Sequence, residues 1–141
     1  MDTVITNYEI PFFDVDAYRI VWHGNYPKYF EIARCHLLEV IGIPYAEMEK
    51  NGYFFPIVDM HIKYIKPLVF GQKVIFSATL SEWQNRLKID YTIKDQTTQD
   101  VHTKASTKQM AIKHPEQITQ FESPTFILEK VDAWLSKNNA L

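Results

Sequence analysis

Residues 14–41 have the sequence DVDAYRIVWHGNYPKYFEIARCHLLEVI, and this stretch decides how the chain folds. A short acidic segment that starts at Asp14 leads into residues 26–41, where apolar side chains recur at spacings of three and four. That period predicts a helix of about 24 Å with a buried face. Pro27 suits the first turn of a helix, and Gly42 suits the position at which one ends. The sequence therefore predicts one long helix directly after the acidic segment.

Most of the remaining chain alternates apolar and polar residues with a period of two, which predicts antiparallel strands with one covered face. We expect strands within residues 4–13, 53–66, 73–80, 87–94 and 101–113, a short helical turn at 44–50, and a closing helix at 125–137. One long helix packs beside five strands most simply when the sheet wraps around it. The expected fold class is therefore α+β, with an antiparallel sheet of about five strands around a central helix.

Length and composition restrict the kind of protein. A chain of 141 residues, 46% hydrophobic and 23% charged, predicts a single globular domain over residues 1–141. A net charge of −2 argues against general nucleic-acid binding, and no apolar run is long enough to span a membrane. The first residues lack the basic and apolar regions of a signal peptide, and Cys35 is the single cysteine. These features predict a cytoplasmic protein.

The acidic segment also suggests a chemistry. Asp16 lies seven residues before His23, which directly precedes the predicted helix. A carboxylate can supply or activate a nucleophile, and the free amides of a first helical turn can hold an oxygen that gains negative charge. Together these groups suit the hydrolysis of an activated carbonyl. On its own, Asp16 fits better as a turn residue than as a catalytic one, and His23 and Asn25 also fit as helix-capping residues.

Three motifs in this region resemble a known family. They are Asp14-Val15-Asp16, then residues 20–26 (IVWHGNY), then residues 29–34 (YFEIAR). With residues 64–67 (YIKP) and Gly71, they resemble the patterns of the 4-hydroxybenzoyl-CoA thioesterase-like family. That family has the hotdog fold and includes the small acyl-CoA thioesterases associated with the Tol-Pal system.

The resemblance covers about residues 8–113 and implies a function. It implies that Asp16 is the catalytic carboxylate, either as nucleophile or as general base on a water molecule. It also implies that the backbone N–H of His23 polarises the carbonyl of an acyl thioester. Asn25 and Tyr26 would then contact the substrate. Arg19 stands where the family usually has glycine, so it either redirects the loop or meets an anionic part of the substrate.

The resemblance further implies that no separate cofactor is needed, because coenzyme A or phosphopantetheine is part of the substrate. The expected substrates are acyl-CoA or acyl carried on acyl carrier protein. A homodimer or homotetramer is expected, with the acyl pocket at the subunit boundary and lined partly by Tyr26 and Phe30.

Two other functions stay open at the level of sequence. A dehydratase or isomerase of the same fold would use a histidine and a helix carboxylate, for which His23 with Glu31 or Glu39 are the candidates. A non-catalytic acyl-binding domain is the third possibility, and Arg19 is the best argument for it. The spacing of Glu31 and Arg34 is explained simply by an ion pair on the helix surface.

Overall fold

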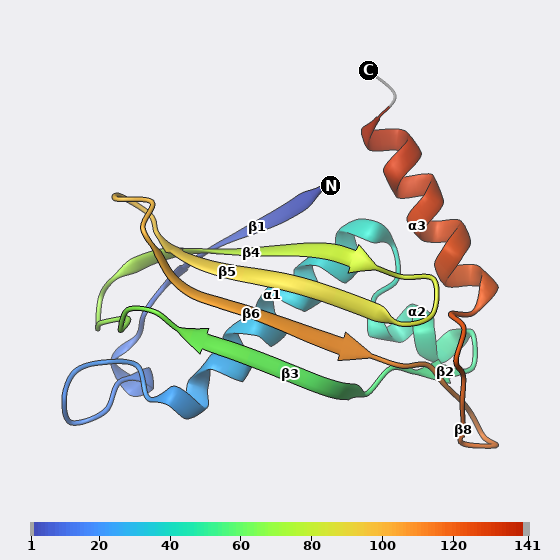
Figure 1. The fold of residues 1–141 in the computed structure, drawn as a ribbon, viewed down its shortest axis with the longest axis horizontal. Coiled ribbons are helices and arrows are strands. Elements are labelled where there is room, and N and C mark those ends of the chain that lie inside the picture. The colour runs from blue at the N-terminus through green and yellow to red at the C-terminus, as the bar shows by residue number, and fades with distance from the viewer. Residues whose placement is uncertain (1, 140–141) are drawn as a thin grey trace.

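The computed structural model describes residues 2–139 and shows a long helix against a five-stranded sheet (Figure 1). The helices are α1 (Tyr26–Ile41), α2 (Tyr45–Lys50) and α3 (Thr125–Asn138). The strands are β1 (Thr3–Glu9), β2 (Tyr53–Phe54), β3 (Ile57–Tyr64), β4 (Lys73–Glu82), β5 (Leu87–Asp95), β6 (Val101–Gln109), β7 (Ile112–Lys113) and β8 (Ile118–Thr119). The large sheet has the order β1-β4-β5-β6-β3 with antiparallel neighbours throughout, and β2, β7 and β8 form a small second sheet. The predicted architecture is confirmed.

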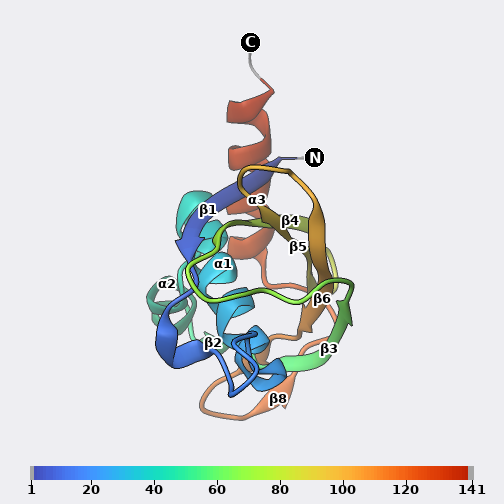
Figure 2. The same cartoon turned by 90° about the vertical axis from the view of Figure 1, so that its left-hand side faces the viewer.

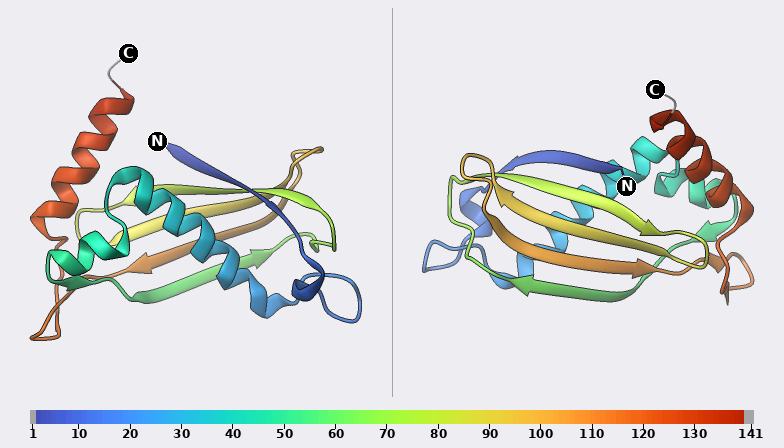
Figure 3. Two further views of the ribbon diagram at one scale, coloured as in Figure 1. Left: turned by 180° about the vertical axis from the view of Figure 1, so that it is seen from behind. Right: turned by 45° about the horizontal axis from the view of Figure 1, so that its top comes forward.

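The large sheet curves around α1, as the view along the sheet in Figure 2 shows. Helix α1 packs mainly against β4 and β1. The inward residues of β4 and β5 are buried in strict alternation, as their sequence pattern predicts, and they face buried residues of α1 such as Tyr29, Phe30 and Leu37. Seen from behind in Figure 3, α1 crosses the concave face of the sheet, and α3 extends away beyond one end. The core therefore lies between α1 and the sheet.

The predicted bounds of α1 are confirmed at both ends. Pro27 occupies the first helical turn, where its missing N–H leaves no intrahelical bond unmade. Gly42 takes a left-handed conformation with φ of 98°, and its N–H donates to the carbonyl oxygens of Leu38 and Glu39 at 3.0 and 3.1 Å. A residue without Cβ adopts that conformation at little cost, so the helix ends where the glycine lies.

Three strand predictions were too long. The strand expected within residues 53–66 is divided into β2 (Tyr53–Phe54) and β3 (Ile57–Tyr64). The first strand ends at Glu9, and after Pro11 the chain forms a short 3₁₀ turn at Phe12–Asp14. The last long strand, expected to run to residue 113, ends at Gln109, because its partner β3 begins at Ile57 opposite that residue. Beyond that point the chain pairs with β2 instead.

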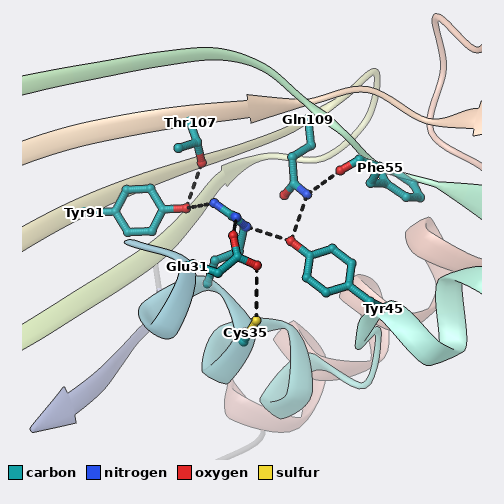
Figure 4. A network of polar contacts seen from close by, with 8 residues as sticks. Glu31, Cys35, Tyr45, Phe55, Tyr91, Thr107 and Gln109 are labelled. Atoms are coloured by element: carbon teal, nitrogen blue, oxygen red, sulfur yellow. Dashed lines mark hydrogen bonds and ion pairs between the residues drawn. The ribbon is translucent and has the colours of Figure 1, made fainter. Parts of the chain in front are cut away.

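A polar network inside the core joins α1 to the sheet (Figure 4). The Arg34 side chain is only 3% exposed, forms an ion pair with Glu31, and donates to the hydroxyl oxygens of Tyr45 (2.8 Å) and Tyr91 (3.3 Å). The ion pair with Glu31 is confirmed, and Glu31 lies at the helix surface as expected, but Arg34 is buried, which the sequence did not predict. A buried guanidinium is tolerated only when its donors are paired, so these contacts fix the position of α1 on the sheet.

Candidate active site

The two carboxylates of the acidic segment lie in opposite environments. Asp14 is 1% exposed, forms an ion pair with Lys28, and accepts a hydrogen bond from the Tyr29 hydroxyl at 2.7 Å. Burial, together with this hydrogen bond and the Asp14 charge, raises the pKa of Tyr29 above its ordinary value, so Tyr29 stays a protonated donor. Both oxygens of the Asp14 carboxylate are therefore used in contacts with other side chains of the protein.

Asp16 is partly exposed and lies at the surface of a cleft. Its Oδ1 accepts the backbone N–H of Tyr18 at 2.8 Å. Across residues 2–139, no side chain donates a hydrogen bond to the Asp16 carboxylate or pairs with it as an ion. This carboxylate therefore has free acceptor capacity toward a bound molecule.

The loop that carries Asp16 is tight. The N–H of Asp16 donates to the carbonyl of Ile20, and the N–H of Arg19 donates to the carbonyl of Asp16, both at 2.9 Å. Arg19 has a φ of 65°, which is the left-handed region that favours glycine. Arg19 therefore adopts a left-handed backbone conformation that glycine would adopt with less strain.

The histidine before α1 lies in a short 3₁₀ turn, His23–Asn25, that leads directly into the helix. Within the described residues, the N–H groups of His23 and Gly24 donate no hydrogen bond, as is usual at the start of a helix. Aligned peptide dipoles give this end of α1 a partial positive charge. The turn thus offers amide donors to an oxygen that carries negative charge.

Asn25 connects this turn to the acidic segment. Its Nδ2 donates to the carbonyl oxygen of Asp14 at 2.8 Å, and the N–H of Trp22 donates to the same oxygen at 3.1 Å. The side chain of Asn25 is therefore engaged with the main chain and does not line the cleft. Its place as a substrate-contacting residue stays a prediction.

The cleft has a volume of about 270 Å³ and brings together three residues selected from the sequence, Asp16, His23 and Tyr26. Tyr26 is only 3% exposed, and burial raises the pKa of its hydroxyl. The remaining lining residues are Ile20, Val21, Tyr64, Ile65, Lys66 and Pro67. Arg19 lies outside this cleft and lines a neighbouring hollow of about 440 Å³, together with Asp16, Phe12 and Phe70.

Sequence reasoning missed two residues of this region. Asp14 gave no local sign of burial, because Lys28 and Tyr29 reach it from the next element. Tyr64 was recognised only as part of a turn motif, yet its hydroxyl donates to the carbonyl oxygen of His23 at 3.0 Å. The YIKP motif was the signal that could have placed Tyr64 near the site.

Within the part of the chain that the structure describes, neither the geometry of possible metal ligands nor the length and hydropathy of the helices gives a candidate for another kind of site. Among residues 2–139, no three His, Cys, Asp or Glu side chains are grouped so that they could hold a metal ion. In the same part of the chain, no helix combines the length and apolar character that crossing a membrane requires.

Comparison with known families identifies the superfamily to which this chain belongs. Residues 10–135 match the thioesterase-like superfamily, and the chain belongs to that superfamily. It is 33% identical over 75 residues to "Putative acyl-CoA thioesterase YneP" of Bacillus subtilis (strain 168). The matched region covers 53% of this chain and 54% of that protein. The chain thus matches about half the length of the curated relatives.

Solved structures agree with the assignment. DHNA-CoA thioesterase from Staphylococcus aureus superimposes with a TM-score of 0.82 at 26% identity, over 100% of this chain and 97% of that one. A 4-hydroxybenzoyl-CoA thioesterase in complex with 4-hydroxybenzoyl-CoA shares the fold, with a TM-score of 0.79 at 17% identity over 92% and 98% of the two chains. The hotdog fold expected from the sequence motifs is confirmed.

Proposed function

We propose that this protein hydrolyses acyl thioesters, with coenzyme A or a carrier-protein phosphopantetheine as the thiol. The observation that carries the proposal is that Asp16 and His23 line one cleft at the start of α1, and that the backbone N–H of His23 donates no hydrogen bond within the described residues. Membership of the thioesterase-like superfamily supports it. A thiolate leaves readily, so a carboxylate and an oxyanion-binding amide are sufficient for the chemistry.

Two routes through Asp16 fit this geometry. In the first, an Asp16 oxygen attacks the thioester carbon, the carbonyl oxygen gains charge near the His23 N–H, and the carbon–sulfur bond breaks to leave a mixed anhydride that water then cleaves. In the second, Asp16 takes a proton from the water that attacks the carbon. A single turnover in H₂¹⁸O distinguishes them by the label found in Asp16. In the first route, water that attacks the Asp16 side of the anhydride leaves ¹⁸O in the Asp16 carboxylate and ¹⁶O from Asp16 in the product acid, whereas the second route leaves Asp16 unlabelled and places ¹⁸O in the product acid.

We also propose that Arg19, Asn25 and Tyr26 act on the substrate side of the site. Arg19 supports this role best, because its exposed side chain and Asp16 line the same hollow. An anionic group on the acyl part of the substrate, or near the thioester sulfur, would meet the guanidinium there.

The proposed assembly is a homodimer or homotetramer. Strand β3 is at the edge of the sheet and is exposed on both faces, with Val58 54% and Tyr64 50% exposed. Antiparallel pairing of two β3 strands would bring the Tyr64 end of one near the Ile57 end of the other. The apolar hollow of about 410 Å³ that Phe54 and Phe55 line would then extend the partner's cleft. Light scattering on the protein tests this assembly directly.

We further propose a cytoplasmic location, which suits both the single cysteine and an acyl-CoA substrate.

The test of the proposed function is incubation with a panel of aromatic and aliphatic acyl-CoA and acyl carrier protein thioesters in the presence of a thiol reagent. Release of thiol is the expected result. Loss of water from 3-hydroxyacyl substrates without thiol release would instead indicate the dehydratase, and binding without either reaction would indicate an acyl-binding domain. Glu31, one of the two carboxylates that are candidates for the dehydratase, forms an ion pair with Arg34, and this contact disfavours Glu31 as the catalytic acid of a dehydratase.

A further inference from the structure

Tyr64 contacts the turn that carries the proposed oxyanion donors, although it belongs to the opposite side of the cleft. It is the last residue of β3, and its hydroxyl donates to the carbonyl oxygen of His23 at 3.0 Å. Its ring packs edge-on against the ring of Tyr26, with centroids 4.7 Å apart and planes at 82°. Two independent contacts therefore fix Tyr64 against the start of α1.

These contacts act on peptide groups that offer free N–H donors. The His23–Gly24 peptide has its oxygen held by Tyr64, and its N–H is the free amide of Gly24. The Trp22–His23 peptide has its oxygen held by the N–H of Asn25 at 2.9 Å, and its N–H is the free amide of His23. Because a peptide is planar, fixing the direction of its C=O also fixes the direction of its N–H.

The hydrogen bond from Tyr64 also affects donor strength. A proton donated to a carbonyl oxygen polarises the whole peptide unit, and chains of hydrogen bonds strengthen one another in this way. An oxyanion site works best when its donors are already oriented before charge develops. Without the hydroxyl, the turn would keep its Asn25 contacts but lose the hydrogen bond at the His23 carbonyl oxygen.

We propose that Tyr64 is a positioning residue that orients and polarises the turn at His23, so that its amides can stabilise the oxyanion of a thioester. This inference rests on the proposed thioesterase function. Tyr64 acts through the main chain of His23 and does not touch the reacting atoms. Its contribution appears in the transition state, where the carbonyl oxygen carries charge, more than in the bound substrate.

The test compares Tyr64→Phe with Tyr53→Phe, in which a partly exposed tyrosine of β2, outside the cleft, loses its hydroxyl. Using whichever acyl-CoA the wild-type protein hydrolyses, we expect Tyr64→Phe to lower kcat about tenfold with KM changed less than twofold. The control should keep both values. An unchanged kcat in Tyr64→Phe, with wild-type protein active, would overturn the role of Tyr64 alone. Inactivity of the wild-type protein on every acyl thioester would instead overturn the function on which it rests.

Two spectroscopic readouts separate positioning from general stability. In an Asp16→Asn background, with the acyl-CoA that the wild-type protein hydrolyses bound, the infrared band of the thioester carbonyl should move back toward its value in water when Tyr64 becomes phenylalanine. The ¹⁵N resonance of Gly24 should also move, because its chemical shift responds to the hydrogen bond at the preceding carbonyl. A carbonyl band and a Gly24 resonance that both stay in place would contradict the proposal.

Discussion

The Nδ2 of Asn25 donates to the carbonyl oxygen of Asp14 at 2.8 Å, and this bond joins the loop that carries Asp16 to the turn that opens α1. The carboxylate and the amide that we propose to act in thioester hydrolysis lie on the two segments joined by this bond. The N–H of Trp22, which donates to the same Asp14 oxygen at 3.1 Å, joins the two segments a second time.

Replacement of Asn25 by alanine should loosen this connection. We expect Asn25→Ala to destabilise the fold by about 1 kcal/mol, as for one net hydrogen bond, and to lower kcat about tenfold. Asn51→Ala is the matched control, because the Nδ2 of Asn51 also donates to a backbone carbonyl at 2.8 Å, at the end of α2. Equal losses of activity in the two variants would contradict a role of Asn25 in the site.

Asp14 and Asp16 should respond differently to the same substitution. Asp14→Ala removes the acceptor of the buried Tyr29 hydroxyl, so we expect a loss of about 2 kcal/mol of stability and a lower thermal midpoint. Asp16→Ala removes a partly exposed carboxylate with no side-chain partner and should leave the midpoint unchanged within about 2 °C. Differential scanning calorimetry measures both, and a midpoint that falls only in Asp16→Ala would reverse the assignment of structural and catalytic carboxylate.

Arg19→Gly separates backbone strain from substrate contact. Glycine relieves the left-handed conformation, so the variant should be more stable by up to about 1 kcal/mol. Gln99 has the same φ of 65° in the β5–β6 turn, and Gln99→Gly should show a similar gain. We expect KM to rise only in Arg19→Gly. Steady-state kinetics with an unaltered KM would exclude a contact between the guanidinium and the substrate.

The hydrogen bonds of the Asp95 carboxylate should make the free energy of unfolding depend on pH. The N–H groups of Thr97 and Thr98 donate to its Oδ1, and Gln72 donates to its Oδ2 at 2.8 Å. The hydrogen bond from the Thr98 backbone is the largest of the effects that lower the pKa of this carboxyl to about 2. A lowered folded-state pKa means stability that is fully present above the unfolded pKa of 3.8 and lost as the pH falls toward 2.

Asp95→Asn should therefore unfold at a lower temperature than wild type at pH 6, and the difference should shrink as the pH falls from 4 to 2. Thermal unfolding at a series of pH values measures this. A difference between the two proteins that stays constant over that range would show that the charge of Asp95 does not stabilise the turn.

The sequence predicted best those features that local physical chemistry controls. The ends of α1 followed from Pro27 and Gly42, and the buried alternation of β4 and β5 followed from their period of two. The end of β6 did not, because it depends on where the partner strand β3 begins.

In the site, too, the sequence predicted what depends on local spacing and not what depends on distant parts of the chain. Asp16 and His23 were found from their spacing before a helix, and they share the cleft. The burial of Asp14 and of Arg34 depends on side chains that only the fold brings near, such as Tyr91 across the core. The contact between Tyr64 and His23 likewise spans 41 positions of sequence, and the YIKP motif was its one sign in the sequence.

The proposed role of Asp16 is tested most directly by the rate of thiol release by wild-type protein and by Asp16→Ala, with Asp132→Ala on the exposed side of α3 as the matched control. We expect Asp16→Ala to lose at least about a thousandfold in kcat while keeping its fold and assembly, and Asp132→Ala to retain wild-type turnover. Near-normal thiol release by a folded Asp16→Ala protein would contradict a catalytic role of Asp16.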